Sequence, residues 1–340
     1  MLVTRRKIKR CLLQRERKQH AITLSASSIN SFQTCHKMYY YDKVARIKPA
    51  EKADALSFGS VVHKGLECIF RWLAFEQSEK EKVRTFAIDD VTMAAAEASL
   101  SPEDLCKAKA MIDEYIDLYF DENKSLFEVI EIEDEFKSPI CNRNGRPDNR
   151  LNIRGYIDAV VKNRITGEYF VVEHKTAGQV TDGYLQRVEI DWQVAIYIDT
   201  VRRRYGSCAG VIYDVLKKPK QERSLGETDG EFEARKAASK TGRIKRKTEE
   251  SINDFYTRVR ASVDESYFIR QIVKPSDAIM AQFRDELYAT AKDILNTKTF
   301  SKSTCNCLKY GTCPYMDLCC NAGTIFGLED KYTIESEVFK

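Results

Sequence analysis

Residues 155–175 read GYIDAVVKNRITGEYFVVEHK, two apolar runs that flank a short polar segment. The first run extends from Leu151 to Val161 and the second from Tyr169 to Glu173, and both are rich in the β-branched and aromatic residues typical of strands. Residues 164–167, Arg-Ile-Thr-Gly, lie between them and have the composition of a hairpin turn. The stretch therefore predicts two antiparallel strands at the centre of the fold.

Charged side chains interrupt this apolar hairpin. If the chain turns at residues 164–167, Asp158 lies opposite Glu173, and opposed residues have Cβ atoms about 4.5–5.5 Å apart. Two carboxylates at that separation repel each other unless a cation lies between them. Lys175 shares the strand face of Glu173, whereas His174 points away. The pattern predicts a site for Mg²⁺ or Mn²⁺, which prefer oxygen ligands, with a surface ion triad as the alternative.

Composition limits the kinds of protein that this chain can be. Its 340 residues are 43% hydrophobic and 31% charged, and 55 basic against 51 acidic side chains leave a formal charge of +4. These proportions exclude a mostly disordered chain, a collagen-like chain and a small disulfide scaffold. No apolar run approaches the roughly 18–20 residues of a membrane-spanning helix, and the basic beginning of the chain lacks the apolar run of a secretory signal. We therefore expect a cytoplasmic protein, with no membrane partner, whose eleven cysteines stay reduced.

The residue pattern changes several times along the chain, and these changes predict its organisation. Amphipathic periodicity indicates helices on both sides of the central strands, and Ser25 or Ser27 would cap the first helix. The predicted segments are a basic tail (1–24), a helical region (25–125), a core (126–216), a basic flexible insertion (217–250), a second helical region (251–300), a cysteine cap (301–322) and a C-terminal tail (323–340). We expect an α/β fold in which a small mixed sheet is flanked by helices.

The cysteine cap contains five cysteines between residues 305 and 320. Because disulfides are not expected in a reducing compartment, metal ligation is the leading explanation for the cluster. The two Cys-x-x-Cys pairs usual for structural zinc are absent from the cluster, so zinc is the less favoured metal. We expect the cysteines at positions 11, 68, 106, 141 and 208 to be small buried apolar side chains instead.

The hairpin resembles the core of the PD-(D/E)XK nuclease superfamily, particularly its RecB-like branch. A strand that carries the motif Gly155-x-x-Asp158 precedes the Glu-x-Lys-Thr strand, and three more motifs follow the order of that branch. These are Gly59-x-x-x-His63, Gln193-x-x-x-Tyr197 and the segment from Ser27-Ser28-Ile29 to Cys35. The sequence departs from the pattern at Ile157, where the family name has proline, and at Glu173, where this branch often has aspartate.

The resemblance implies a restriction-endonuclease-like core and roles for individual residues. His63, Asp158, Glu173 and the carbonyl of His174 would bind Mg²⁺ or Mn²⁺, and Asp158, Glu173 and Lys175 would form the catalytic set. Gln193 and Tyr197, one helical turn apart, would contact a DNA strand. Glu67 and Glu135 are weaker candidates for the same site.

Iron–sulfur members of this branch have one early cysteine and a late cluster. Carried over by position, this arrangement implies that Cys35, Cys307, Cys313 and Cys319 hold a [4Fe–4S] cluster, with Cys305 or Cys320 as possible replacements and zinc as the alternative. Such a cluster would join distant parts of the chain and act as a structural staple.

The function implied is that of a metal-dependent DNA exonuclease, which acts on single-stranded ends in recombination, repair or replication. The alternatives are a CRISPR-adaptation-type or structure-specific nuclease on the same core, and a non-catalytic DNA-binding recombination partner. Basic clusters, such as Arg202-Arg203-Arg204, either follow a phosphate backbone or form a solvated surface. No helicase motif is visible, so any unwinding would come from a helicase or recombination protein partner.

Overall fold

A computed structural model describes residues 21–50, 54–239, 244–309 and 311–335. The chain divides into two compact units, which we name the sheet unit and the cysteine unit. The sheet unit comprises Ala50–Asp134 and Tyr156–Pro275, and the cysteine unit comprises Met1–Pro49, Glu135–Gly155 and Ser276–Lys340. None of the helices in the described ranges is long and apolar enough to cross a membrane.

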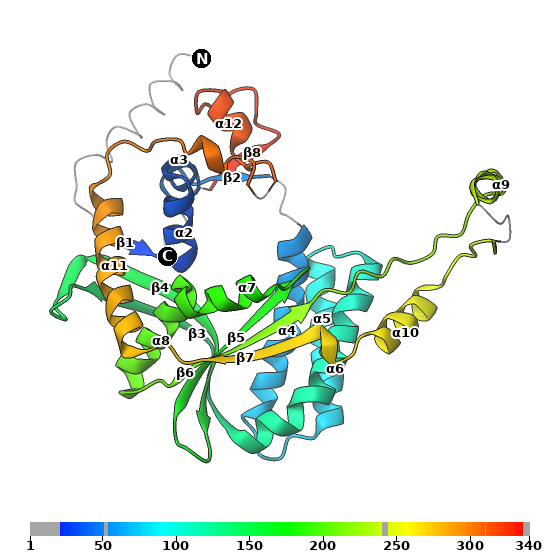
Figure 1. The fold of residues 1–340 in the computed structure, drawn as a ribbon, viewed down its shortest axis with the longest axis horizontal. Helices are drawn as coiled ribbons and strands as arrows, with labels where there is room; N and C mark the ends of the chain where they lie inside the picture. Colours follow the sequence, from blue (N-terminus) through cyan, green and yellow to red (C-terminus); the bar gives the residue numbers. More distant parts are fainter. Residues whose placement is uncertain (1–20, 51–53, 240–243, 310, 336–340) are drawn as a thin grey trace. The chain divides into compact units, whose positions relative to one another are not determined.

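The sheet unit is organised around a mixed sheet (Figure 1). Its strands, in spatial order, are β4 (Pro147–Asn163), β5 (Tyr169–Ala177), β6 (Gly210–Lys217) and β7 (Phe268–Val273), and β3 (Phe127–Cys141) also pairs with β4. β4 and β5 are antiparallel, β5 and β6 are parallel, and β6 and β7 are antiparallel. The sequence predicted only helix over the region that contains β7, because this short strand is half-exposed and carries Arg270 and Gln271 at its centre.

The register of the predicted hairpin is confirmed over the residues that pair. Val161 pairs with Phe170, and the last pair of the ladder joins Ala159 to Val172. The turn is held by Asn163, whose side chain accepts hydrogen bonds from the backbone N–H groups at positions 165 and 166, both at 2.9 Å. Gly167 has φ of 73°, a left-handed conformation that glycine adopts without steric cost.

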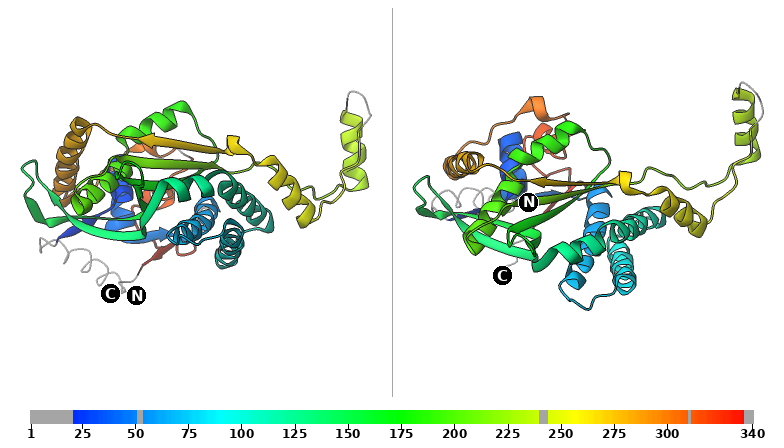
Figure 2. Two further views of the ribbon diagram at one scale, coloured as in Figure 1. Left: turned by 90° about the horizontal axis from the view of Figure 1, so that it is seen from below. Right: turned by 60° about the horizontal axis from the view of Figure 1, so that its bottom comes forward.

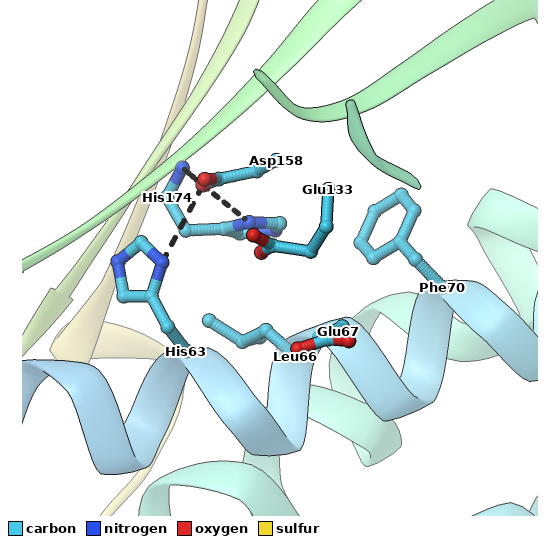
Figure 3. Close-up of a pocket in the computed structure, with 7 residues that line it drawn as sticks. All are labelled: His63, Leu66, Glu67, Phe70, Glu133, Asp158 and His174. Carbon is cyan, nitrogen blue, oxygen red and sulfur yellow. Dashed lines mark hydrogen bonds and ion pairs between the residues drawn. The ribbon is translucent and has the colours of Figure 1, made fainter. Parts of the chain in front are cut away.

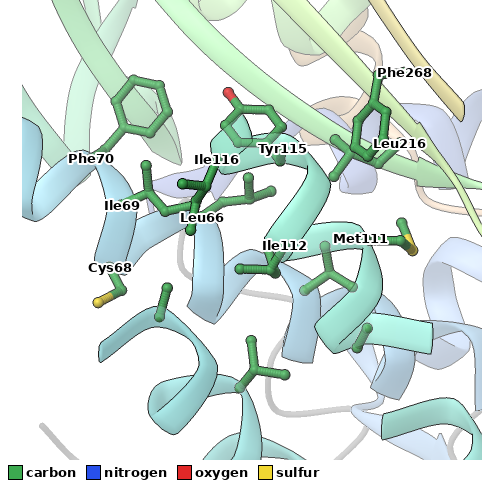
Figure 4. Close-up of a cluster of buried hydrophobic side chains, with 14 of the residues drawn as sticks. Leu66, Cys68, Ile69, Phe70, Met111, Ile112, Tyr115, Ile116, Leu216 and Phe268 are labelled. Carbon is green, nitrogen blue, oxygen red and sulfur yellow. The ribbon is translucent and has the colours of Figure 1, made fainter. Parts of the chain in front are cut away.

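Three helices gather on one face of this sheet (Figure 2). They are α4 (Asp54–Leu73), α5 (Lys80–Glu97) and α6 (Pro102–Leu126), and Ser101 caps α6 just before Pro102. Apolar side chains from α4 and α6 interlock beneath the strands, and the labelled ones are almost fully buried (Figure 4). A Cβ at Gly65 would lie 2.7 Å from Val91, so glycine allows α4 to approach α5 closely.

Two predictions for the sheet unit need correction. The sequence pattern over residues 184–201 predicts one helix. In the structure a 3₁₀ turn (Val188–Ile190) separates α7 (Asp182–Arg187) from α8 (Trp192–Tyr205), and the carboxylate of Asp191 caps α8. The insertion over 217–250 is not simply a flexible loop. It contains α9 (Asp229–Ala238), which begins with a capping box, and a bridge between Leu225 and Glu249; α10 (Ile252–Ser262) follows.

The cysteine unit is assembled from segments that are distant in sequence. Its elements are β1 (Ile22–Leu24), α2 (Ala26–Thr34), α3 (His36–Tyr39), a π-helical turn (Tyr40–Val44), β2 (Ile47–Pro49), α11 (Asp277–Asn296), a 3₁₀ turn (Thr304–Asn306), α12 (Met316–Cys320) and β8 (Tyr332–Ile334). Ser25 caps α2 through a capping box with Ser28, which confirms the predicted helix start.

Both predicted tails are shorter than expected. β1 pairs in parallel with β4, so the basic tail expected over residues 1–24 ends before Ile22, and residues 1–20 lie outside the described ranges. β8 lies within the segment 323–340, which was expected to be a tail, and it pairs antiparallel with β2. A small apolar core joins the ends of the unit through Tyr41, Ile47, Tyr315, Leu318 and Tyr332.

Candidate active site

One face of α4 provides half of a pocket in the sheet unit (Figure 3). His63, Leu66, Glu67 and Phe70 point from α4 toward Glu133 of β3, Asp158 of β4 and His174 of β5. A Cβ at Gly59 would lie 3.0 Å from the hydroxyl of Thr176 on β5. The absence of a side chain at Gly59 therefore lets α4 approach β5 one turn before His63, which gives the Gly-x-x-x-His motif a physical reason.

Asp158 occupies the place where the β4–β5 ladder stops. Its Oδ2 atom accepts a hydrogen bond from the backbone N–H of His174 at 2.8 Å, and it lies 3.2 Å from Nδ1 of the same residue and 3.6 Å from Nδ1 of His63. The side-chain carboxylate of Asp158 therefore accepts the hydrogen bond of a β5 backbone N–H at the position where backbone pairing between β4 and β5 ends. Burial alone would raise the pKa of Asp158, but hydrogen bonding to His174 and the charges of His63 and His174 lower the pKa to about 2.

Glu173 is the most enclosed carboxylate of the site, at 1% exposure. Its Oε1 atom forms an ion pair with Nζ of Lys175, whereas Oε2 is buried without a hydrogen-bond partner in the described part of the chain. Burial and the charge of Asp158 raise the pKa of Glu173 to about 8, against the opposing effect of Lys175. A buried carboxylate oxygen without a donor is costly, and a cation would remove that cost.

The side chains of Glu173 and Lys175 face α8. Nζ of Lys175 donates to Oε1 of Gln193 at 3.0 Å, and Nε2 of Gln193 donates to the hydroxyl of Tyr197 at 2.8 Å. Tyr197 is only 5% exposed, so its hydroxyl supports Gln193, which lies nearer the ammonium group. The contacts to DNA predicted for Gln193 and Tyr197 stay predictions.

The predicted site residues therefore form two groups, one on each face of β5. His174 packs toward α4, with its ring centroid 5.2 Å from that of Phe70, whereas Glu173 and Lys175 point to the other face of the strand. His63 and Asp158 lie with His174, and Gln193 and Tyr197 lie with Lys175. Asp158 acts on both groups, because its charge influences His63 and Glu173 alike.

Two more carboxylates line the pocket on the α4 side. Glu67, a weaker candidate from the sequence, is held by Lys64 at 2.6 Å and by Arg71. Glu133, which the sequence did not indicate, replaces the candidate Glu135, an exposed residue two positions later on β3. Glu133 has φ of 48°, a left-handed conformation. This conformation is uncommon for residues other than glycine, so the sequence does not predict it at a glutamate. Burial and the charges of Asp158 and Glu67 raise the pKa of Glu133.

The four cysteines predicted as cluster ligands all belong to the cysteine unit. Residues 301–306 lie against the end of α2, where the backbone N–H of Lys37 donates to the carbonyl of Ser301 at 3.0 Å and the side chain of Asn306 donates to the carbonyl of Thr34 at 2.6 Å. The backbone N–H of Ser303 also approaches the sulfur of Cys35 at 3.4 Å. The early cysteine therefore meets the late segment despite their separation in sequence.

The thiols of this unit differ in exposure and in their influence on one another. Burial raises the pKa of Cys313, and the charges of Cys307, Cys319 and Cys35 raise it further. Cys305 and Cys320 are exposed. The ten cysteines of the described ranges are free thiols, and Cys68, Cys106 and Cys208 are buried as predicted. The prediction is wrong for Cys141, which is partly exposed, and Cys11 lies outside the described ranges.

A profile of the PD-(D/E)XK nuclease superfamily matches residues 23–320, which include the hairpin, the α4 motif and α8. The chain belongs to this superfamily. Membership indicates a nuclease with a nucleic acid substrate, and the superfamily typically uses a divalent metal ion. The mixed sheet flanked by helices agrees with the superfamily core. A comparison with curated protein sequences finds no match.

The donor chemistry of the site fits the divalent ion typical of the superfamily. Within the residues that the structure describes, no three His, Cys, Asp or Glu side chains converge closely enough to hold a metal ion as they stand. Asp158 is nevertheless ionised, the buried Oε2 of Glu173 lacks a donor, and burial lowers the pKa of His63, which favours the neutral form that binds metals.

The arginine run on α8 is committed to protein contacts. Arg204 pairs with Glu131 at 2.5 Å and Asp134 at 2.6 Å, and Arg203 pairs with Asp199 at 2.8 Å. Arg202 donates to the backbone carbonyl of Cys208 at 3.1 Å. The solvated-surface and phosphate-following interpretations of this cluster are both incomplete, because its charges secure α8 to β3 and to the loop before β6.

Proposed function

We propose that this chain is a metal-dependent DNA exonuclease that hydrolyses phosphodiester bonds from single-stranded ends, in DNA recombination, repair or replication. The observation that carries the proposal is the environment of Lys175, whose ammonium group lies between the carboxylate of Glu173 and the amide of Gln193. Superfamily membership supports the reaction class. The preference for single-stranded ends rests on the RecB-like arrangement of motifs.

Each residue of the site has a role in this reaction. His63, Asp158, Glu173 and the carbonyl of His174 would hold Mg²⁺ or Mn²⁺, which supplies charge neutralisation at the phosphate and lowers the pKa of a water molecule. Burial alone would lower the pKa of Lys175, but the charge of Glu173 raises it overall, so the side chain stays protonated. It can then donate a hydrogen bond to a non-bridging oxygen of the phosphate, in a direction that Gln193 fixes.

A cleavage assay tests this function. End-labelled single-stranded, duplex and branched DNA, and internally labelled circular DNA, would be incubated with Mg²⁺ or Mn²⁺ and with the wild-type protein, Lys175→Ala or Lys162→Ala. Lys162 is a matched control, because it lies on the same hairpin but packs its ammonium over Tyr169, 5.6 Å from the ring centroid. We expect single-stranded ends to be degraded, Lys175→Ala to lose at least about a hundredfold in rate and Lys162→Ala to retain its rate.

The other outcomes of this assay separate the alternatives. Trimming of duplex ends indicates the CRISPR-adaptation-type nuclease, and cleavage of circular DNA or of branched junctions indicates a structure-specific enzyme. Binding of DNA without cleavage in either metal indicates a non-catalytic recombination partner. Equal cleavage by Lys175→Ala and the wild type contradicts the role of this lysine.

We also propose that Cys35, Cys307, Cys313 and Cys319 hold a [4Fe–4S] cluster with a structural role. The docking of residues 301–306 on the end of α2 supports it, because this contact brings the late segment to the helix end that carries Cys35, although the four thiols of the described chain do not converge as they stand. Four thiolates suffice for one such cluster, and ligation would tie together segments that are distant in the sequence.

The metal content of the protein distinguishes the two candidate metals. Protein purified without oxygen should contain iron and sulfide and absorb in a broad band near about 400 nm. A colourless protein that contains zinc in equal amount to the chain would contradict the iron–sulfur proposal and support the alternative.

A further inference from the structure

A buried polar network lies behind the active site, on the side of β5 that faces α6. Its centre is Asp214 of β6, which is 2% exposed and accepts hydrogen bonds from Nε and Nη2 of Arg270 at 2.8 and 2.7 Å. The hydroxyl of Tyr115, a fully buried residue of α6, donates to the same carboxylate at 2.8 Å. The donors fix Asp214 and Tyr115 in a single arrangement.

The ring of His174 joins this network to the active site. Its Nε2 atom lies 3.3 Å from the hydroxyl of Tyr115, and its Nδ1 atom lies 3.2 Å from Oδ2 of Asp158. An ionised carboxylate only accepts hydrogen bonds, so Nδ1 carries the hydrogen atom that points to Asp158. The ring is also clamped by Phe70 and Tyr115, with centroid separations of 5.2 and 5.8 Å.

A purely structural role does not account for this ring. Asp214 already has Arg270 and Tyr115 as donors, so it does not require His174. An apolar ring at position 174 could fill the same space between Phe70 and Tyr115. With an apolar ring at position 174, Asp158 would lose an interaction. Asp158 lies beyond the last pair of the β4–β5 ladder, and its carboxylate is hydrogen-bonded to the backbone N–H and to Nδ1 of His174.

We propose that the side chain of His174 is a positioning residue that holds Asp158 in the orientation needed to bind the catalytic metal ion, and that Tyr115 and Asp214 hold the ring of His174. This inference rests on the proposed function, because it assigns Asp158 to the metal. It gives the side chain at the middle position of Glu-x-Lys a role in orienting Asp158. The superfamily resemblance implied a role in metal binding only for the backbone carbonyl of this residue. Groups of this kind, which orient a metal ligand from behind, typically change metal affinity by 10–100-fold.

Metal affinity, measured without DNA, tests the proposal. Binding of Mn²⁺ would be followed by calorimetry and by electron paramagnetic resonance for the wild type, His174→Phe, His174→Asn and Tyr115→Phe. We expect His174→Phe to bind Mn²⁺ about 10–100-fold more weakly, because it keeps the ring but loses both nitrogens. His174→Asn should recover part of the affinity, because its amide places a donor near the position of Nδ1. Tyr115→Phe should show a smaller loss.

Tyr256→Phe is the matched control, because it also removes a tyrosine hydroxyl from a carboxylate that arginines surround. Tyr256 donates to Asp113 at 2.5 Å, and Asp113 also contacts Arg84 at 3.1 Å, among residues that do not line the pocket. Tyr256→Phe should keep the wild-type Mn²⁺ affinity, and thermal unfolding of each variant would show that it is folded.

Two results overturn the proposal. Unchanged Mn²⁺ affinity in folded His174→Phe would show that the ring does not position Asp158, and an equal loss in Tyr256→Phe would show that the loss reflects general loosening. Cleavage is a separate measurement, so a protein whose variants follow the expected order of affinity but which cuts no DNA contradicts the proposed function alone.

Discussion

The two candidate metal sites of this chain are built in different ways. In the sheet unit, the carboxylate site forms from strand pairing and hydrogen bonds, since the backbone N–H of His174 holds Asp158 and Lys175 holds Glu173. In the cysteine unit, the thiols belong to segments that are distant in the sequence, and in the part of the chain that the structure describes they do not converge on a common point. Within the described residues neither site brings three ligands together as it stands, but hydrogen bonds already hold the carboxylates of the first site, whereas the second would depend on its cluster to gather the thiols.

Asp158→Asn should have the largest effect on activity. The amide still accepts the hydrogen bond from His174, so the fold should persist, but the charge that binds the metal is lost. We expect cleavage of single-stranded DNA to fall by about 10²–10³-fold, with a change in thermal unfolding midpoint of only a few degrees. Glu135→Gln, which removes an exposed carboxylate outside the pocket, is the control and should cleave at the wild-type rate.

Substitution of the cluster ligands should affect the cysteine unit more than the sheet unit. Cys35→Ser and Cys313→Ser are expected to reduce bound iron by at least about tenfold and to make the cysteine unit susceptible to proteolysis, because the cluster would be part of its folding. Cys320→Ser, at an exposed thiol, should keep its iron. Iron analysis and limited proteolysis measure these effects, and full iron content in Cys35→Ser would remove this residue from the ligand set.

The affinity of the carboxylate site for Mn²⁺ should increase with pH. Because burial and the charge of Asp158 raise the pKa of Glu173 to about 8, metal binding to its carboxylate competes with protonation below that pH. Affinity should therefore increase by up to about tenfold for each pH unit below that pKa and level off above it. The lowered pKa of Asp158 contributes no slope in this range. Glu173→Gln should bind Mn²⁺ weakly with a flat profile, and a steep profile in this variant would assign the proton to another group.

The backbone of Glu133 should give the smallest of these effects. Its φ of 48° is unfavourable for any residue with a Cβ, so Glu133→Gly should be more stable than Glu133→Ala by about 1 kcal/mol in urea unfolding. Equal stability of these two variants would show that the conformation relaxes in solution. A matched Glu135→Gly and Glu135→Ala pair should show the opposite order, because glycine weakens a strand that lies in the extended region.

The parts of the fold that sequence could predict are those determined locally. The hairpin register followed from the turn at residues 164–167, and the cap at Ser25 followed from its hydroxyl side chain. β7 and the left-handed backbone of Glu133 were missed, because each depends on contacts with strands that are distant in the sequence. For the site, the alternation of side chains predicted that Glu173 and Lys175 share a face that His174 leaves, but the motifs did not predict that His63 and Asp158 lie with His174.

The alternation of side chains along β5 has a consequence for how this segment tolerates change. Three consecutive residues serve two different environments, since Glu173 and Lys175 face α8 and His174 faces α4. A single-residue insertion in the turn at 164–167 could be absorbed by the loop and leave both environments intact. The same insertion after Val171 would move the side chain of Glu173 into the space of the His174 imidazole and the imidazole into the space of Lys175. The length of this strand is therefore as strict a requirement as the identity of its residues.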